Sequence, residues 1–528
     1  MLHVVVICAG PYANHAVDTA LKPLAAELDQ HLWGLSPGFH RLAFEKGQVL
    51  LTLCVGDVSK LLRQQAFEAD FVGLPAAALT DTEPIYAAKA IARLCKPEAV
   101  LTASVNEPMQ AALRQCGFVV PGSDEPFKAT YSPTWRIKMR RQTVVPTTCV
   151  VVGSGLAGAA VASSLARRGW AVTVLDAATA PANGASGLPA GLLVPHTSPD
   201  DSPLSRLSRA GVRTTLQQAR SLLRHGIDWG HTGALQRHME VDNSHSPLDQ
   251  TARIQSQSPA WRDWHVPASD RTLNAAGLPV QSPAMWHAQA GWIKPAALVS
   301  AWLNADGITW RGGAEVTQLD FTPEGWQLRD AAGQLMGQAD LVVLSAGYAS
   351  QALVRCAGAA RPNLQAIRGQ VTYGLQQHSD TLPPFVVNGH GGLISSITTP
   401  DGPIWLMGAG YERDALVPQV TAQGHADNFK RLQTLLPQAA RALVDRFDPQ
   451  NARGWSGIRC VTPNRLPLVG PVAAASKPGL WMCTGMGSRG LSFAALCGEL
   501  LAAQLHGEPL PIENQLAKTL QPELCARS

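Results

Sequence analysis

The segment Gly153–Gly158, with the sequence Gly-Ser-Gly-Leu-Ala-Gly, constrains the fold more than any other part of the chain. The apolar run Cys149–Val152 precedes it, and the alanine-rich stretch Ala159–Arg168 follows it. In a strand–loop–helix unit of this kind, the first glycine permits a tight turn and the second lets the backbone approach a ligand. The third lets the helix pack closely on the strand. The spacing therefore predicts the start of a parallel α/β sheet.

A second apolar run, Ala171–Leu175, follows the predicted helix and ends in Asp176, which lies 23 residues after Gly153. A carboxylate at this place can accept hydrogen bonds from a ribose, while the helix N-terminus attracts phosphate groups. An ordinary glycine-rich turn would not need such an acid. The whole unit predicts a dinucleotide site formed by Gly153, Gly155, Gly158 and Asp176.

Two later segments favour FAD over NAD as the dinucleotide. Asp340–Gly347 is an apolar strand that ends in small residues, which let the chain pass close to a nucleotide, and Gly347 is its candidate contact. Gly485–Leu491 is glycine-rich and precedes an apolar helix, so its N–H groups can face the flavin's O2/N1 edge. The candidate contacts in this segment are Gly487, Ser488, Arg489, Gly490 and Leu491. Three separated segments around one cofactor predict a Rossmann-type FAD-binding domain with an interleaved α+β substrate domain.

Length and composition indicate a soluble cytoplasmic protein with more than one domain. The 528 residues exceed what one hydrophobic core usually holds. Only 16% of the residues are charged and the net charge is +4, which speaks against general electrostatic binding of nucleic acid. The ten cysteines are scattered without a CxxC pair, which indicates a reducing cytosol and no metal site. The apolar run Leu2–Cys8 is too short for a signal peptide or a membrane span.

The order of the apolar runs places a domain boundary near residue 143. Before it, strand-like runs such as Val49–Val55 and Ala99–Ala103 alternate with helix-like stretches such as Ile85–Leu94, which predicts a mostly parallel sheet covered by helices. We expect a first domain at 1–142, a linker at 143–148 and an FAD-dependent oxidoreductase domain at 149–522. In the last domain, the expected FAD-binding segments are about 149–240, 335–370 and 455–510, and substrate-domain segments lie between them.

Several further motifs carry a family resemblance. They are Gly184–Gly187, Ala190–Pro195, Ala290–Pro295, Ile367–Thr372, Gly457–Gly470 and Gly485–Leu491. From Val144 to about Pro522 the chain resembles the glycine/D-amino-acid oxidase superfamily, and more specifically the oxidoreductase half of the bifunctional MnmC family. The resemblance adds Ser186 and Gly187 to the expected FAD contacts. Leu188–Ala190 departs from the polar residues that many relatives carry there, which leaves the local flavin contacts open.

The resemblance implies a tRNA substrate and the oxidation of a secondary amine. In this family the side chain –CH2–NH–CH2–COO⁻ at C5 of the wobble uridine loses its carboxymethyl group as glyoxylate, which leaves an aminomethyl group. Arginine can hold such a carboxylate with two parallel hydrogen bonds. Arg459 matches the Gly-x-Arg arginine of glycine-oxidase-like proteins and is the candidate anchor. A structural ion-pair role for Arg459 is the alternative, and Arg368 and Arg489 are rivals that we expect nearer the flavin.

Two other functions stay open on the sequence. One is a small-molecule amine or amino-acid oxidase such as a glycine oxidase, against which the attached N-terminal domain argues. The other is a non-catalytic tRNA-binding or assembly protein, against which the nearly complete set of flavin motifs argues. The basic segment Trp135–Gln142 is either a solvated strand face or a tRNA contact.

The N-terminal region resembles the methyltransferase half of the same family. The matching segments are Gly38–Leu42, Gly56–Asp57, Ala92–Pro97 and Arg114–Phe118. In that family a strand and a glycine loop that holds S-adenosylmethionine (SAM) come first, whereas this chain starts at what corresponds to the second strand. Cys8 stands where relatives carry an acid for the SAM ribose, and Val72–Pro75 stands where they carry Asp-Gly-Phe-x-Pro. We therefore expect a degenerate methyltransferase domain, retained for folding or tRNA docking, in which SAM binding and methylation are in doubt.

Overall fold

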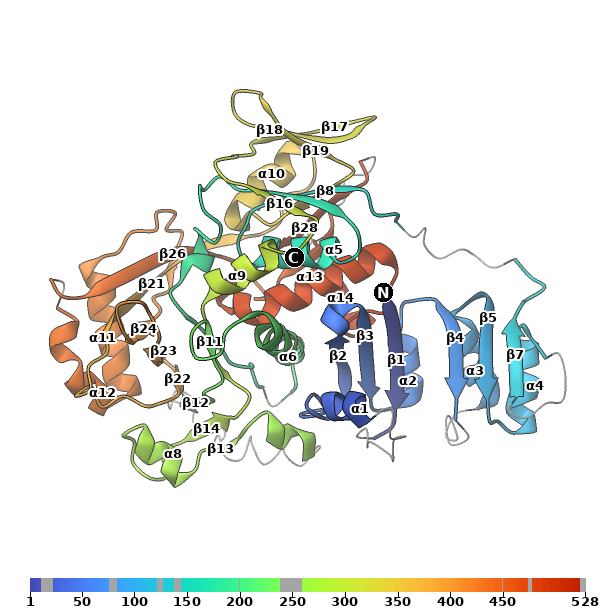
Figure 1. Ribbon diagram of the computed structural model, residues 1–528, viewed down its shortest axis with the longest axis horizontal. Helices are drawn as coiled ribbons and strands as arrows, with labels where there is room; N and C mark the ends of the chain where they lie inside the picture. The colour runs from blue at the N-terminus through green and yellow to red at the C-terminus, as the bar shows by residue number, and fades with distance from the viewer. Residues whose placement is uncertain are drawn as a thin grey trace. The chain divides into compact units, whose positions relative to one another are not determined.

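The computed structural model describes residues 1–10, 22–75, 83–120, 127–136, 144–198, 200–237, 259–448, 450–472 and 477–522. The chain forms two compact units (Figure 1). Unit 1 consists of Met1–Val145 and Ala502–Lys518, and unit 2 consists of Pro146–Leu501 and Thr519–Ser528. Across the described ranges, no helix has both the length and the apolar character needed to cross a membrane.

Unit 1 contains two small sheets, with the strand orders β1-β3-β2 and β4-β5-β7-β6 (Figure 1). The strands are β1 (Leu2–Cys8), β2 (Gly38–Phe44), β3 (Val49–Val55), β4 (Ala69–Leu74), β5 (Cys95–Ala103), β6 (Phe118–Val119) and β7 (Phe127–Tyr131). β1 runs parallel to β3 and β4 runs parallel to β5. Antiparallel strands complete each sheet. The expected alternation of strands and helices is confirmed.

Short helices cover these sheets. They are α1 (Lys22–Asp29), α2 (Val58–Gln64), α3 (Pro84–Ala92) and α4 (Glu107–Gln115). α2 packs on β1 and β3, and α3 packs beside α4. α3 and α4 share one hydrophobic core with β5 and β7, so each small sheet has an apolar face covered by its own helices.

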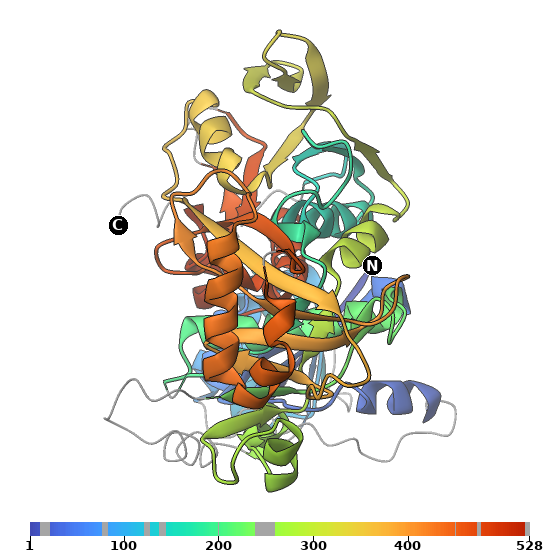
Figure 2. The ribbon, with the colours of Figure 1, turned by 90° about the vertical axis from the view of Figure 1, so that its left-hand side faces the viewer.

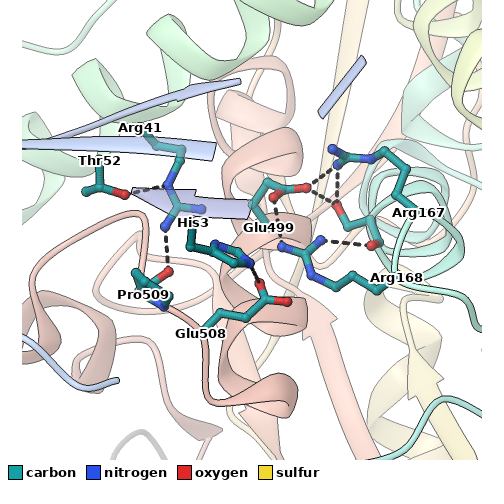
Figure 3. Close-up of polar contacts among 9 residues, drawn as sticks. His3, Arg41, Thr52, Arg167, Arg168, Glu499, Glu508 and Pro509 are labelled. Atoms are coloured by element: carbon teal, nitrogen blue, oxygen red, sulfur yellow. Dashed lines mark hydrogen bonds and ion pairs between the residues drawn. The ribbon is translucent and has the colours of Figure 1, made fainter. Parts of the chain in front are cut away.

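The C-terminal segment Ala502–Lys518 belongs to unit 1 and is held there by polar contacts (Figure 3). Arg41, which is 5% exposed, donates from Nη2 to the carbonyl oxygen of Pro509. His3 Nε2 lies 3.6 Å from Glu508 Oε2. The structure therefore differs from the domain that we expect to end at 522. No local sequence pattern reveals this, because Arg41 and Pro509 are 468 residues apart.

The first large sheet of unit 2 has the order β16-β9-β8-β20-β28-β27. Its strands are β8 (Thr148–Val152), β9 (Ala171–Leu175), β16 (Ile308–Arg311), β20 (Leu341–Leu344), β27 (Leu468–Pro471) and β28 (Leu480–Thr484). Every pair is parallel except β27 with β28. Helix α5 (Leu156–Ala166) follows β8, and helix α13 (Gly490–His506) follows β28. This is the predicted Rossmann-type arrangement.

Helices α5 and α13 pack directly against each other. A Cβ added at Gly498 would lie 2.7 Å from the carbonyl oxygen of Ala160, so the close approach requires a glycine. One residue further along α13, Glu499 forms ion pairs with Arg167 and Arg168 at the end of α5 (Figure 3). The two helix N-termini are thus fixed relative to one another within unit 2.

The second large sheet of unit 2 has nine strands in the order β13-β14-β12-β22-β23-β24-β21-β25, and β26 also pairs with β21. The strands are β12 (Ala234–Arg237), β13 (Val266–Pro267), β14 (Ala284–His287), β21 (Gln365–Leu375), β22 (Val386–Gly389), β23 (Gly391–Ile397), β24 (Ile404–Gly408), β25 (Glu412–Arg413) and β26 (Arg453–Val461). Helix α11 (Ala422–Leu435) packs on β21, β23 and β24, and α12 (Pro437–Ala442) lies beside it, as Figure 2 shows. These elements form the α+β part between the nucleotide-binding segments.

Smaller elements complete unit 2. Two three-stranded sheets contain β10 (Gly191–Leu193), β15 (Gly291–Ile293) and β11 (Trp229–Gly230), and β17 (Gln318–Thr322), β18 (Gly325–Arg329) and β19 (Leu335–Ala339). The remaining helices include α6 (Pro203–Leu222), α8 (Asp270–Ala275), α9 (Pro295–Leu303), α10 (Ser350–Cys356) and, in unit 1, α14 (Asn514–Lys518). α9 packs on α5, the helix that follows the glycine loop.

Candidate functional site

A cavity of about 1110 Å³ lies within unit 2 and brings together most of the residues that the sequence singles out. Its walls come from both large sheets and from the starts of α5 and α13. The predicted site residues that line it are Gly153, Gly155, Asp176, Ser186, Gly347, Arg459, Gly487, Ser488, Arg489, Gly490 and Leu491. Gly158 and Gly187 do not line it. Segments more than 300 residues apart in sequence therefore meet around one space.

The glycine loop is shaped by close backbone contacts. Gly153 has φ +105°, and a Cβ there would lie 2.6 Å from the carbonyl oxygen of Ser345. A Cβ at Gly158 would lie 1.8 Å from the carbonyl oxygen of Gly153, so this glycine serves the packing of α5 and not the cavity wall. Gly155 precedes the first residue of α5 and faces the cavity. These are the contacts that the glycine spacing requires.

Asp176 both lines the cavity and ties the loop to β9. Its Oδ2 accepts hydrogen bonds from the Ser154 amide at 2.6 Å and from the Ser154 hydroxyl at 2.7 Å. Its Oδ1 accepts one from the Ala178 amide at 2.9 Å. A carboxylate has about four lone-pair sites, so acceptor capacity is left for a ribose hydroxyl. Ser154 lies inside the glycine loop but was not among the predicted site residues, because the loop pattern specifies only the glycines.

Ser186 supports the same loop by direct contact with the start of α5. Its Oγ accepts a hydrogen bond from the Leu156 amide at 2.9 Å, which satisfies one free N–H at the start of α5. A Cβ at Gly155 would lie 3.0 Å from this oxygen, so a side chain there would fill the space between loop and serine. Gly187 is packed against the Ala182 carbonyl oxygen, where a Cβ would lie at 2.9 Å. The loop, the helix start and Asp176 together fit the dinucleotide portion of FAD.

The segment 487–491 forms another wall of the cavity. A short 3-10 turn over Gly487–Arg489 leads into α13, and Gly487 has φ +57°. Arg489 lies here, and burial lowers the pKa of its guanidinium, with the positive charge of Arg465 adding to the effect. Arg465 also lines the cavity; it lies inside the matching motif Gly457–Gly470 but was not among the predicted site residues. Backbone N–H groups and two arginines thus make this wall electropositive.

Arg459 extends from β26, opposite Ile367 of β21, and lines the same cavity. Its Nη1 donates to Ser488 Oγ at 2.6 Å, and its Nη2 donates to the carbonyl oxygen of Gly410. Burial lowers the pKa of Arg459, and nearby Tyr411 acts weakly in the opposite direction. Among the residues that the structure describes, no carboxylate pairs with Arg459, so the alternative role in an ion pair lacks an acidic partner.

Arg368 lies elsewhere, and the expectation that it approaches the flavin is wrong. It pairs with Glu412, which stands directly across from it where β25 joins β21. It also donates to the Gln419 carbonyl oxygen and does not line the cavity. The contact with Glu412, which is 44 residues away in sequence but adjacent in the sheet, holds Arg368 in this position.

Gly369 makes room for Arg459 and was not singled out by the sequence as a site residue. A Cβ added there would lie 1.8 Å from Nη2 and 2.6 Å from Cζ of Arg459. The guanidinium therefore passes directly over the β21 backbone. The only available signal was the position of Gly369 inside the matching motif Ile367–Thr372.

The acidic and the basic residues of the cavity wall come from different segments of the chain. The acids that line it are Asp176, which follows β9, and Glu315, which follows β16. They lie close together because the Ala314 amide donates to the Asp176 carbonyl oxygen. The cations that line it are Arg459, Arg465 and Arg489, from β26 and the segments that follow it. One part of the cavity can thus accept hydrogen bonds from a ribose, and another can bind an anion.

The comparisons with known proteins agree with this site. The family model described as "FAD dependent oxidoreductase" matches residues 148–504. A relative from Polaromonas naphthalenivorans (strain CJ2), named tRNA 5-methylaminomethyl-2-thiouridine biosynthesis bifunctional protein MnmC, is 48% identical over 96% of this chain and 82% of its own length. The protein of the same name from Delftia acidovorans (strain DSM 14801 / SPH-1) is 44% identical over 100% of this chain and 87% of its own length.

Solved structures share the fold. Glycine oxidase from Geobacillus kaustophilus is 21% identical with a TM-score of 0.54, and the match covers 68% of this chain and 94% of that one. Iminodiacetate oxidase from Chelativorans sp. BNC1 is 21% identical with a TM-score of 0.55, over 71% of this chain and 98% of that one. With the cavity, the glycine loop and the close relatives in agreement, the chain belongs to the FAD-dependent oxidoreductase family and, within it, to the MnmC family.

Proposed function

We propose that this chain removes the carboxymethyl group from 5-carboxymethylaminomethyl-(2-thio)uridine at position 34 of tRNA by FAD-dependent oxidation, which leaves 5-aminomethyl-(2-thio)uridine. The names of the relatives support this, because proteins of tRNA 5-methylaminomethyl-2-thiouridine biosynthesis match nearly the whole chain. The proposed partner is tRNA, and we place the reaction in the cytoplasm with it.

The observation that carries the proposal is the cation of Arg459 in the cavity wall. A guanidinium has five N–H donors, and the two hydrogen bonds to Ser488 and Gly410 leave others free for a ligand. A carboxylate is the ligand that suits this planar group best, because it accepts two parallel hydrogen bonds. The substrate side chain –CH2–NH–CH2–COO⁻ ends in such a carboxylate.

When bound, FAD supplies the two-electron acceptor for the CH2 group between the amine and the carboxylate. The protein binds the carboxylate at Arg459 and so orients that CH2 group. The positive charges of Arg465 and Arg489 favour an uncharged amine, because like charges lower the pKa of an ammonium group. Loss of two electrons and two protons converts CH2–NH to a C=N bond. Water then hydrolyses that bond to glyoxylate and the primary amine.

The direct test uses tRNA that carries 5-carboxymethylaminomethyl-uridine. The purified flavoprotein is incubated with this tRNA, which is then digested for nucleoside mass spectrometry. We expect aminomethyl-uridine with the wild type and much less with Arg459→Ala. Arg368→Ala is the matched control, because Arg368 pairs with Glu412 outside the cavity and its loss should leave conversion largely intact. Unchanged tRNA, together with flavin reduction by free glycine or sarcosine, would contradict the proposal and favour a small-molecule amine oxidase.

We also propose that unit 1 is a degenerate methyltransferase domain. β1 ends at Cys8, whose Sγ donates to the Cys54 carbonyl oxygen at 3.7 Å, and burial raises the pKa of the Cys8 thiol. A neutral thiol is a weak acceptor and does not replace a carboxylate that binds two ribose hydroxyls. Val72 lies in β4 where the family's acidic segment would stand.

Isothermal titration with SAM tests this second proposal. We expect no binding at micromolar SAM by the intact chain. The tRNA assay gives a second readout, since addition of SAM should leave the product as aminomethyl-uridine. Micromolar binding of SAM, or the appearance of methylaminomethyl-uridine, would show that unit 1 still works as a methyltransferase.

A further inference from the structure

Two large apolar side chains stand exposed at the rim of the cavity. Tyr411 is 52% exposed and Leu416 is 61% exposed, and both also line the cavity. They belong to one short segment that follows β24. Exposed side chains of this size that also line a cavity are candidate contacts for a ligand that extends out of it.

The backbone of this rim segment is well fixed. The Gly410 amide donates to the Gln370 carbonyl oxygen at 3.0 Å, and the Asp414 amide donates to the Ala366 carbonyl oxygen at 3.0 Å. Between them, β25 pairs with β21. Tyr411 is therefore presented by a segment that is bonded to the main sheet on both sides. The ring is exposed because of its place in the fold and not because the segment is loose.

Tyr411 and Arg459 are neighbours in the cavity wall, close enough for one substrate molecule to contact both. The Cζ atom of Arg459 lies 5.9 Å from the centre of the Tyr411 ring. In –CH2–NH–CH2–COO⁻, four bonds join uridine C5 to the carboxylate carbon, which spans about 5 Å when extended, since three backbone bonds span about 3.5 Å. A carboxylate bound to Arg459 therefore leaves the attached pyrimidine within reach of the Tyr411 ring.

We propose that Tyr411 is the stacking platform for the pyrimidine ring of the substrate nucleotide, with Leu416 as the apolar contact beside it on the same rim. This inference rests on the proposed function, because it requires a nucleotide as the amine substrate. Proteins that recognise single-stranded loops of RNA stack unpaired bases on aromatic side chains. An anticodon base that has left its stack offers such a face, whereas free glycine or sarcosine has no ring and gains nothing from an aromatic surface at the rim.

The test compares three variants of the holoenzyme in the oxidation of tRNA that carries 5-carboxymethylaminomethyl-uridine. Stacking of one base on an aromatic ring corresponds to about a 5- to 150-fold change in binding. We therefore expect Tyr411→Ala to raise KM by about 5- to 150-fold with kcat largely retained, because stacking acts equally on the ground state and the transition state. Tyr411→Phe keeps the ring and should stay close to the wild type. Val417→Ala is the matched control, since Val417 is 67% exposed on the same segment but does not line the cavity.

The possible outcomes distinguish a failure of the Tyr411 proposal from a failure of the proposed function. Flavin content and the thermal unfolding temperature are measured for each variant, so that a folding defect is recognised. A Tyr411→Ala protein that folds, binds FAD and keeps the wild-type KM for tRNA overturns the platform and leaves the proposed function standing. An equal rise of KM in Tyr411→Phe or Val417→Ala also overturns it. A wild-type protein that oxidises sarcosine but not the tRNA overturns the proposed function and the platform together.

Discussion

Substitution of Gly369 by alanine should disable the carboxylate anchor without touching its charge. The new Cβ would stand 1.8 Å from Nη2, 2.6 Å from Cζ and 2.8 Å from Nε of Arg459. Non-bonded heavy atoms need about 3.5–4.0 Å, so the guanidinium must move by roughly 2 Å. Such a shift breaks the present bonds to Ser488 and Gly410 and misaligns the planar group with a bound carboxylate.

The size of the effect follows from the hydrogen bonds at stake. A hydrogen bond to a charged group contributes about 1.5–3 kcal/mol. Loss of one such bond to the substrate lowers kcat/KM by roughly 10- to 150-fold, since each 1.4 kcal/mol is about a factor of ten. A substrate displaced by about 1 Å from the reactive geometry can lose about 100-fold in rate, which is of the same order. The Gly369→Ala variant should therefore lose nearly as much activity as Arg459→Ala, although it retains Arg459.

Steady-state kinetics with the modified tRNA measures this change, and flavin absorbance and thermal unfolding report on folding. Gly337→Ala is the control, because Gly337 also lies in a strand of unit 2 and its added Cβ would come no closer than 3.4 Å to Val150. The reasoning is refuted if Gly369→Ala binds FAD and retains the kcat/KM of the wild type. It is also refuted if both glycine variants lose activity to the same extent.

Four further outcomes can be measured on the same protein. Arg459→Lys keeps the charge but loses the planar fork, so kcat/KM for tRNA should fall by roughly 10- to 150-fold in steady-state assays; an unchanged value would show that geometry is unimportant there. Asp176→Ala should weaken FAD binding by roughly 10- to 150-fold in equilibrium dialysis, because a charged acceptor for the ribose is removed; wild-type affinity would exclude that role. Burial lowers the pKa of His196 to about 4, so the unfolded chain binds the proton first as pH falls below the ordinary value near 6.5. Unfolding temperature should therefore fall between pH 6.5 and pH 4, and less steeply in His196→Gln; equal slopes would contradict this cause. Arg41→Met leaves the Pro509 carbonyl without its donor and should destabilise unit 1 by about 1–3 kcal/mol in urea unfolding; an unchanged midpoint would argue against this contact as a stabilising one.

The parts of the site whose positions depend on nearby residues could be predicted from the sequence. Gly153, Gly155 and Asp176 meet around the cavity because a strand, a tight turn and a helix dictate their spacing within 23 residues. The meeting of these residues with Gly347 and with the segment 487–491 could also be anticipated, since parallel strands present their carboxyl ends at one edge of a sheet.

Positions that depend on contacts between distant strands could not be found in this way. Gly369 has an ordinary strand context, and its importance comes from the side chain of Arg459 on the paired strand. Arg368 was misplaced because its partner Glu412 lies on another strand. Tyr411 could not be predicted as a site residue, because an isolated aromatic residue outside any motif indicates no site until the cavity beside it is known.

The assignment of Ala502–Lys518 to unit 1 has a consequence for synthesis of the protein. Ribosomes add roughly 5–20 residues per second, so at least about 23 s pass between Arg41 and Pro509, which are 468 residues apart. During that time the nascent N-terminal region has emerged, but the segment that supplies its last acceptor groups has not been made. The contacts of this segment within unit 1 can therefore form only after nearly the whole chain has been made, so unit 1 is completed last although its first strand is made first. Residues 1–145 expressed alone would lack the carbonyl acceptor that Pro509 offers to Arg41 and the carboxylate that Glu508 offers to His3.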